Sequence, residues 1–336
     1  MSQSSSPGVV AITGGSSGIG RAAAQLFARR GWRVALIARG LPALETARAE
    51  LAGRRAHVSI HEADVADCDA LRAAAAAIVA EHGPITAWVN NAGVSIFAPF
   101  PEVTDAEFRR VTEVTYLGTV NGTRVALEHM RPRDEGTIVQ VCSAIGLRGV
   151  PLQSAYSGAK YAMRGFSEAV RAELIHERSR VHLTVVYPPS VNTPFYSHAT
   201  ARIDDMPRPP PPIYQPEIVA DAIHFAATHS RRDVLVGAQT VQTALLNALA
   251  PSVADFLMGR LAPRLQNSRN PGIAAARDEN LFAASHLPSP THGPFDVESL
   301  STSLQLWATK NRGTVGAGLA LGAAVLAMAG RRGAAK

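Results

Sequence analysis

Residues 9–21, with the sequence VVAITGGSSGIGR, place a short apolar run directly before a glycine-rich loop and the start of an amphipathic helical pattern. A strand, loop and helix in this order bring the amides of a helix N-terminus up to a phosphate, and glycines let a pyrophosphate approach the backbone. The stretch therefore predicts a dinucleotide site, with an ordinary tight turn as the alternative. The residues expected to bind the cofactor here are Gly14, Ser16, Ser17, Gly18, Ile19 and Gly20.

Outward from this loop, short apolar runs alternate with Ala-rich helical patterns as far as about residue 236. Strands separated by helices in this way form a parallel sheet that is covered on both faces. The sequence thus predicts an α/β fold: a doubly wound Rossmann domain over residues 1–240, with a parallel sheet of about seven strands and helices on both faces. The seven runs are VVAI, RVALIA, HVSI, TAWVN, TIVQVCS, VHLTVVY and DVLVG.

Two later stretches depart from this alternation. Residues 188–216 are Pro-rich and predict a stiffened loop beside the site, or else a polyproline II segment that a partner domain binds. After residue 238 the alternation stops, and residues 241–312 are expected to form a helical and irregular extension. Because the loop and the helices after residue 238 are apolar or Pro-rich, we expect them to shape a pocket for a hydrophobic substrate.

The segment 313–330, GTVGAGLALGAAVLAMAG, carries no charge over eighteen residues. It is just long enough to span a bilayer, but glycine and alanine supply little hydrophobic free energy. A transmembrane helix or membrane association and packing in a soluble protein therefore both stay open.

Composition narrows the class of protein. The chain has 336 residues, of which 46% are hydrophobic, so it can fill a sizeable core. The net charge of +6 is spread without a long basic run, which argues against nucleic acid as a partner. Two cysteines outside any CxxC, and an N-terminus without a secretory signal, predict a cytoplasmic protein.

Arg39 follows the second apolar run, in ALIARG. An NAD site would place an acidic residue here for the ribose hydroxyls, whereas a guanidinium suits the 2′-phosphate of NADP(H). NADP(H) is therefore the preferred cofactor and NAD(H) a possible one. The alternative is a surface arginine at the end of a strand.

Residues 154–163, SAYSGAKYAM, place Tyr156 and Lys160 four residues apart on a predicted helix. Positions i and i+4 lie on one face of a helix, so the phenol and the ammonium can act as one unit. A phenol donates a proton to an oxygen that gains negative charge, and a nearby cation lowers its pKa from about 10. The spacing alone is also compatible with an ordinary helix surface.

Together with other stretches, these segments resemble the classical short-chain dehydrogenase/reductase family over residues 7–240. TGGSSGIG resembles the family's TGxxxGxG loop, and NNAG resembles its signature after the fourth strand. Ser143 lies thirteen residues before Tyr156, which is the spacing expected between the family's catalytic serine and tyrosine. YPPSVNTP at residues 187–194 resembles the PGxxxT segment, with Pro189 where glycine is usual.

The resemblance implies hydride transfer between a nicotinamide cofactor and a carbonyl or secondary alcohol. It implies Tyr156 as the acid in reduction and the base in oxidation, Lys160 as the residue that tunes it and binds the nicotinamide ribose, and Ser143 as a second donor to the substrate oxygen. The family's catalytic asparagine falls at Thr115, which indicates a modified proton relay or slowed catalysis. Further cofactor contacts implied are Asp64 and Val65, then Asn91, Ala92 and Gly93, and finally Pro188, Val191 and Thr193. The family also implies a homo-oligomer.

Other functions stay open beside this one. The chain could bind NADP(H) as a redox sensor or scaffold with little turnover, or the fold could serve an epimerase or dehydratase. His57 and His61 lack further ligands at metal spacing, so no metal site is expected. Asn121 begins an NGT sequon, but it falls in a predicted helix of a chain without a secretory signal, so glycosylation is not expected.

Overall fold

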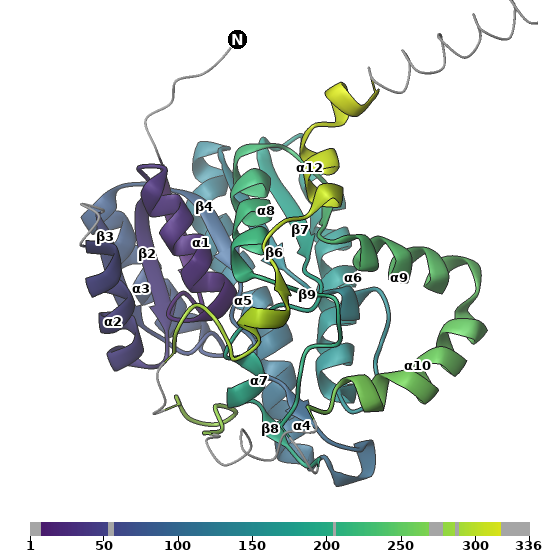
Figure 1. The fold of residues 1–336 in the computed structure, drawn as a ribbon. Coiled ribbons are helices and arrows are strands. Elements are labelled where there is room, and N and C mark those ends of the chain that lie inside the picture. The colour runs from purple at the N-terminus through teal and green to yellow at the C-terminus, as the bar shows by residue number, and fades with distance from the viewer. Residues whose placement is uncertain (1–7, 53–56, 204–205, 269–277, 286–288, 317–336) are drawn as a thin grey trace, which may run out of the picture.

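The computed structural model describes residues 8–52, 57–203, 206–268, 278–285 and 289–316. Its centre is a seven-stranded sheet in the order β10-β7-β6-β4-β1-β2-β3, in which every neighbouring pair is parallel (Figure 1). The seven predicted runs are these seven strands, so the predicted sheet is confirmed. The strands are β1 (Val9–Thr13), β2 (Arg33–Ala38), β3 (Val58–Glu62), β4 (Ile85–Asn90), β6 (Gly136–Val141), β7 (Val181–Tyr187) and β10 (Asp233–Leu235).

Helices cover both faces of the sheet, as predicted for a doubly wound fold. Successive strand residues point to opposite faces, and β1 shows the consequence: Val10 and Ile12 belong to one buried cluster, and Val9 and Ala11 to the other. The first cluster is completed by α1 (Gly18–Arg29), α2 (Leu41–Ala52) and α8 (Pro216–Thr228). The second is completed by α3 (Cys68–His82), α4 (Asp105–Thr112), α5 (Gly118–Met130) and α6 (Ser154–His176).

The helical stretch before β6 consists of α4 and α5 joined by a π-helical turn, Glu113–Leu117. α4 begins with a capping box, in which the Thr104 side chain accepts from the Glu107 amide and the Glu107 carboxylate accepts from the Thr104 amide. A single π turn inserts one extra residue into a helix and is frequent at functional sites. Thr115 lies at the centre of this turn.

The extension first forms a pair of helices, α9 (Ala238–Leu249) and α10 (Pro251–Leu265), which projects from the body of the protein (Figure 1). The chain then returns to the body of the protein, where β11 (Ser299–Leu300) pairs with β9 (Ile213–Tyr214) in a separate two-stranded sheet. Helix α12 (Leu304–Lys310) packs beside α8, with the Lys310 ammonium 2.6 Å from the Asp221 carboxylate.

The predicted apolar segment 313–330 lies largely outside the described residues, which end at residue 316. Among the helices that the structure does describe, none has the length and apolar character needed to cross a bilayer.

Candidate functional site

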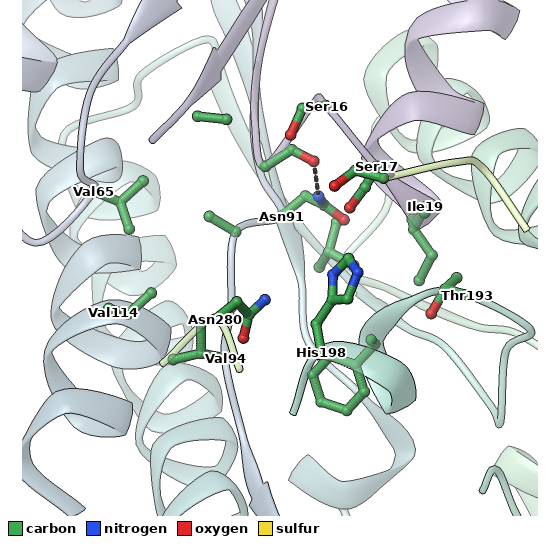
Figure 2. Close-up of a pocket in the computed structure, with 18 of the residues that line it drawn as sticks. Ser16, Ser17, Ile19, Val65, Asn91, Val94, Val114, Thr193, His198 and Asn280 are labelled. Atoms are coloured by element: carbon green, nitrogen blue, oxygen red, sulfur yellow. Dashed lines mark hydrogen bonds between the residues drawn. The ribbon is translucent and has the colours of Figure 1, made fainter. Parts of the chain in front are cut away.

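The candidate site is a cavity of about 250 Å³ at the carboxyl ends of the central strands (Figure 2). β1 lies between β2 and β4, so the strand order changes direction beside it, and such a switch point is where doubly wound sheets bind ligands. Lining residues come from the glycine-rich loop between β1 and α1, residues 14–17, which we call the phosphate loop. Others come from the ends of β4 and β6, the start of α6 and the loop after β7. The structure therefore brings together segments that are far apart in the sequence, from Gly14 to Ser289.

The phosphate loop joins β1 to α1. Gly14 and Gly18 have positive φ angles of 64° and 51°, which favour glycine. A Cβ on Gly20 would lie 2.2 Å from the Gly14 carbonyl oxygen, so the loop closes tightly on the first turn of α1. Ser16 and Ser17 line the cavity together with Ile19 (Figure 2). The geometry fits a pyrophosphate on a helix N-terminus.

The segment after β4 holds this loop in place. The Asn91 side-chain amide donates to the carbonyl oxygens of Thr13 and Gly14, at 3.0 and 3.2 Å. Its backbone amide donates to the Thr13 hydroxyl at 3.0 Å, and Ala92 and Gly93 complete the adjacent wall of the cavity. Asn91 is thus a clamp on the loop, which explains why an asparagine stands here.

At the other end of the cavity, Arg39, Asp64 and Arg110 form one charged group. Asp64 forms ion pairs with Arg110 and, at 3.9 Å, with Arg39. Partial burial would raise the pKa of the Asp64 carboxyl, but the Ala66 amide and Arg110 outweigh burial, so the pKa lies below its ordinary value. With two guanidinium groups and one carboxylate, this corner carries a net charge of +1. Val65 lies beside it and lines the cavity.

Ser143, Tyr156 and Lys160 line one wall of the cavity. The Ser143 hydroxyl oxygen accepts from the Ile145 amide at 3.1 Å, which leaves its proton available for donation. Lys160 is 2% exposed, donates to the Val141 carbonyl at 2.8 Å and lies 5.4 Å from the centre of the Tyr156 ring. The predicted grouping of these three residues is therefore what the fold produces.

The ionisation of this group differs from the prediction in one respect. We expected the ammonium to lower the pKa of the phenol, but burial raises the pKa of Tyr156 above its ordinary value. Burial also lowers the pKa of Lys160 to about 8. Both shifts have the same cause, because removal from water disfavours the charged form of each group. In this structure desolvation is the largest cause of both pKa shifts.

Thr115 lies beside the cavity but is fully buried. Its hydroxyl accepts from the Val94 amide at 3.1 Å and donates to the Val94 carbonyl at 2.9 Å. The hydroxyl thus ties the π-helical turn to the segment after β4. A catalytic role for Thr115 stays a prediction.

The loop after β7 forms the wall next to the phosphate loop. Pro188, Val191 and Thr193 line the cavity, and a Cβ on Gly18 would lie 3.1 Å from the Thr193 Cβ. The following helix, α7 (Phe195–His198), brings two aromatic rings to the site. The Phe195 ring lies 5.6 Å from the Tyr156 ring and 5.4 Å from that of Tyr196. This end of the cavity therefore presents aromatic rings beside the polar side chains of Ser143, Gln153 and His198.

The sequence did not predict one further part of the site, which comes from the segment after α10. We expected the helices after residue 238 to shape the pocket, but no residue of α9 or α10 in the described chain lines the cavity. Both helices project away from it, and the lining residues come from the returning segment instead: Asn280, Ala284, Ser285 and Ser289. His198 and Asn280 are seen at the cavity in Figure 2. No residue pattern in the returning segment pointed to this position.

The described part of the chain contains no group of three His, Cys, Asp or Glu side chains that could hold a metal ion.

Comparisons with known proteins agree with this geometry. A family model described as short chain dehydrogenase matches residues 8–204. The uncharacterized oxidoreductase YxnA of Bacillus subtilis is 36% identical over 265 residues, which cover 78% of this chain and 74% of the relative. The 3-dehydrosphinganine reductase of Danio rerio is 34% identical over 193 residues, 56% of this chain and 58% of the relative. A solved variant of actinorhodin polyketide ketoreductase with NADPH has a TM-score of 0.62 and 28% identity, and the match covers 68% of this chain and 95% of that one.

Proposed function

Since the chain belongs to the short-chain dehydrogenase family and is an oxidoreductase acting on CH–OH groups, we propose that it transfers hydride between NADP(H) and a hydrophobic carbonyl or secondary alcohol. The observation that carries this proposal is the group formed by Ser143, Tyr156 and Lys160 at one wall of the cavity, beside the phosphate loop.

Each of the three side chains has a distinct part in the proposed reaction. The bound cofactor would supply a hydride. When the hydride adds to the carbonyl carbon, the carbonyl oxygen gains negative charge. Tyr156 donates its proton to that oxygen, and its raised pKa keeps the phenol protonated until the charge develops. Ser143 donates a second hydrogen bond, since its own oxygen already accepts from Ile145. Lys160 stabilises the phenolate that remains, because it is held close to the Tyr156 ring.

The charge at the adenosine end supports NADP(H) over NAD(H). A ribose 2′-hydroxyl is recognised by an acidic acceptor, whereas a 2′-phosphate needs positive charge. Arg39 and Arg110 both pair with Asp64, so the only carboxylate in the group is already neutralised and one positive charge is in excess. The solved ketoreductase named above contains NADPH.

The lining of the opposite end supports a hydrophobic substrate. Phe195 and Tyr196 pack against each other there, with Val94 and Ile145 among the neighbouring lining residues. Burial of such surface favours an apolar ligand by about 25 cal/mol for each Å² removed from water.

The test uses purified protein, NADPH or NADH, and a panel of hydrophobic ketones, with the matching alcohols in reverse. Wild type is expected to oxidise NADPH, and Tyr156→Phe to lose at least a hundred-fold in kcat. The matched control is Tyr161→Phe, which removes the same atom from a partly exposed residue on the same helix, where the hydroxyl donates to the Leu147 carbonyl. Equal activity in the two variants would contradict the proposed role of Tyr156.

A sensor or scaffold that binds NADP(H) with little turnover is the second candidate. One observation favours this candidate: the Thr115 hydroxyl already donates its proton to the Val94 carbonyl and accepts from the Val94 amide, so it is less suited to a proton relay. Tight NADPH binding without turnover across the panel would support this candidate. An epimerase or dehydratase would instead turn over substrate without net consumption of cofactor.

We also propose two features of assembly. A homo-oligomer is expected to form through α4 to α6, where Phe108, Tyr161 and Ile175 are exposed large side chains. The second feature is membrane association through residues 313–330. Light scattering in buffer tests the oligomer, and sedimentation with lipid vesicles tests the membrane association.

A further inference from the structure

The described parts of the segment that returns from the extension lie beside the cavity. We call residues 278–285 and 289–296 the strap. At the adenosine end, the Asn280 carbonyl accepts from Arg39 at 2.5 Å. The next carbonyl, of Leu281, accepts from Arg110 at 3.1 Å and from Arg39 at 3.4 Å. The strap therefore holds both guanidinium groups that pair with Asp64.

The middle of the strap contacts the phosphate loop. The Gly18 amide, at the start of α1, donates to the Pro290 carbonyl at 3.1 Å. The Arg21 side chain donates to the Ser289 carbonyl at 2.8 Å and forms an ion pair with Glu50, and Arg21 is only 6% exposed. A buried arginine is costly unless it is paired, so this contact fixes the strap on α1.

The last part of the strap contacts the loop after β7. Asn192 receives two hydrogen bonds from it, from the Gly293 amide to its carbonyl at 3.3 Å and from the Phe295 amide to its side chain at 3.0 Å. A Cβ on Gly293 would lie 2.5 Å from the Thr193 carbonyl oxygen, so the two backbones are in close contact. The strap is thus fixed at the three places where the adenosine, the pyrophosphate and the nicotinamide are expected.

The lining of the cavity indicates what the strap does. Asn280, Ala284, Ser285 and Ser289, all from the strap, line the same cavity as the phosphate loop. A dinucleotide bound in this cavity would therefore lie against the strap.

We propose that the strap is an additional part of the cofactor site, which encloses the adenosine and phosphate portions of the dinucleotide and withdraws for the cofactor to enter and leave. This inference rests on the proposed function. It assigns cofactor binding to residues of the extension, outside the matched family region of residues 8–204.

A reversible cross-link tests the proposal. A Cβ built on Gly40 lies 3.2 Å from the Ala284 Cβ, slightly less than the about 3.5 to 4.5 Å usual in disulfides, so a small shift allows a bond. In the G40C/A284C variant, oxidation before NADPH is added is expected to slow association at least ten-fold. Oxidation with NADPH bound is expected to slow release at least ten-fold, and a reductant reverses both effects. Oxidised wild type and oxidised G40C are the controls, since Cys68 and Cys142 are present in all.

Unchanged rates in the cross-linked protein would overturn the proposal. Failure of the disulfide to form would also overturn it, because Gly40 and Ala284 would then not be neighbours in solution. If reduced wild type binds neither NADPH nor NADH, the proposed function fails, and the strap inference fails with it.

A second pair of variants measures the same property without a cross-link. Gly293→Val forces the strap away from Thr193, whereas Gly259→Val makes the same change on α10, where nothing lies within 4 Å of the added Cβ. Stopped-flow fluorescence is expected to show NADPH release at least ten-fold faster in Gly293→Val than in Gly259→Val. Equal release rates in two folded variants would contradict the proposal.

Discussion

Replacement of Lys160 by methionine is expected to abolish activity and, at the same time, to remove a pH-dependent cost to stability. The side chain is 2% exposed, and its charged head donates to a single carbonyl, that of Val141. Burial lowers its pKa from 10.5 to about 8. At about 1.4 kcal/mol per pKa unit, this shift corresponds to about 3 kcal/mol against the charged form in the folded protein.

The sign of the pH dependence follows from the direction of this shift. The folded pKa of Lys160 is lower than the unfolded one, so between pH 8 and 10.5 the unfolded chain binds more protons than the folded one. Stability rises with pH wherever the unfolded state binds more protons, and the cost of the buried charge is fully present only below about pH 8. Between pH 7 and pH 9.5 wild type should therefore gain about 2 kcal/mol from this residue alone.

Urea denaturation at pH 7 and pH 9.5 measures this gain directly. Lys160→Met lacks this contribution. As the pH rises from 7 to 9.5, the unfolding free energy of wild type should therefore increase by about 2 kcal/mol relative to that of the variant. Changes in packing that do not depend on the charge of Lys160 are the same at both pH values and cancel from the comparison, so the measured change reports the pKa shift. Tyr156→Phe is the control, because the raised pKa of that phenol keeps it protonated at both. A difference between wild type and Lys160→Met that does not change with pH would refute the reasoning.

Three further predictions concern substitutions of single residues. Arg39→Met is expected to raise the Kd for NADPH ten- to hundred-fold, as loss of a charged hydrogen bond of about 1.5 to 3 kcal/mol implies, with less effect on NADH in the same fluorescence titration. Gly20→Ala should lower the melting temperature by several degrees, because its Cβ meets a backbone oxygen at 2.2 Å, while Gly158→Ala, with nothing within 4 Å, should leave it equal or higher. Thr115→Val should cost about 2 to 4 kcal/mol in urea denaturation, since two buried backbone groups of Val94 lose their partner, and Thr115→Ser should retain most of the stability.

The sheet and the grouping of Ser143, Tyr156 and Lys160 at one cavity could be predicted from the sequence because their signals are local. Each buried strand is a short apolar run, and the phosphate loop needs glycine at positions with positive φ such as Gly14 and Gly18. Tyr156 and Lys160 are placed on one face by helix geometry alone. Ser143 joins them because the strand before it, β6, lies next to β7 and β4 in the sheet. These placements need no knowledge of long-range packing beyond the order of the strands.

The parts that could not be predicted depend on contacts between distant segments. The strap has no periodic pattern, and its hold on Arg39 runs through backbone carbonyls, which any residue type supplies. Similarly, the direction of the Tyr156 pKa shift depends on how deeply α7 buries the phenol, and Phe195 is the ring that packs on it. Sequence spacing places the charge beside the phenol, but it does not measure the loss of water.

Cofactor preference shows why a motif residue is not sufficient to decide the chemistry of a site. Arg39 lies where the 2′-phosphate is expected, but the electrostatic potential there also depends on its neighbours. Asp64 pairs with Arg39, and Arg110 pairs with the same carboxylate. The Asn280 carbonyl accepts a hydrogen bond from Arg39. Without Arg110, the Asp64 carboxylate would balance Arg39 alone, and the corner would become neutral. The positive charge available to a phosphate therefore depends on a residue of α4 that no cofactor motif contains. It is this sum over distant segments, rather than the identity of one residue after β2, that determines which dinucleotide the site favours.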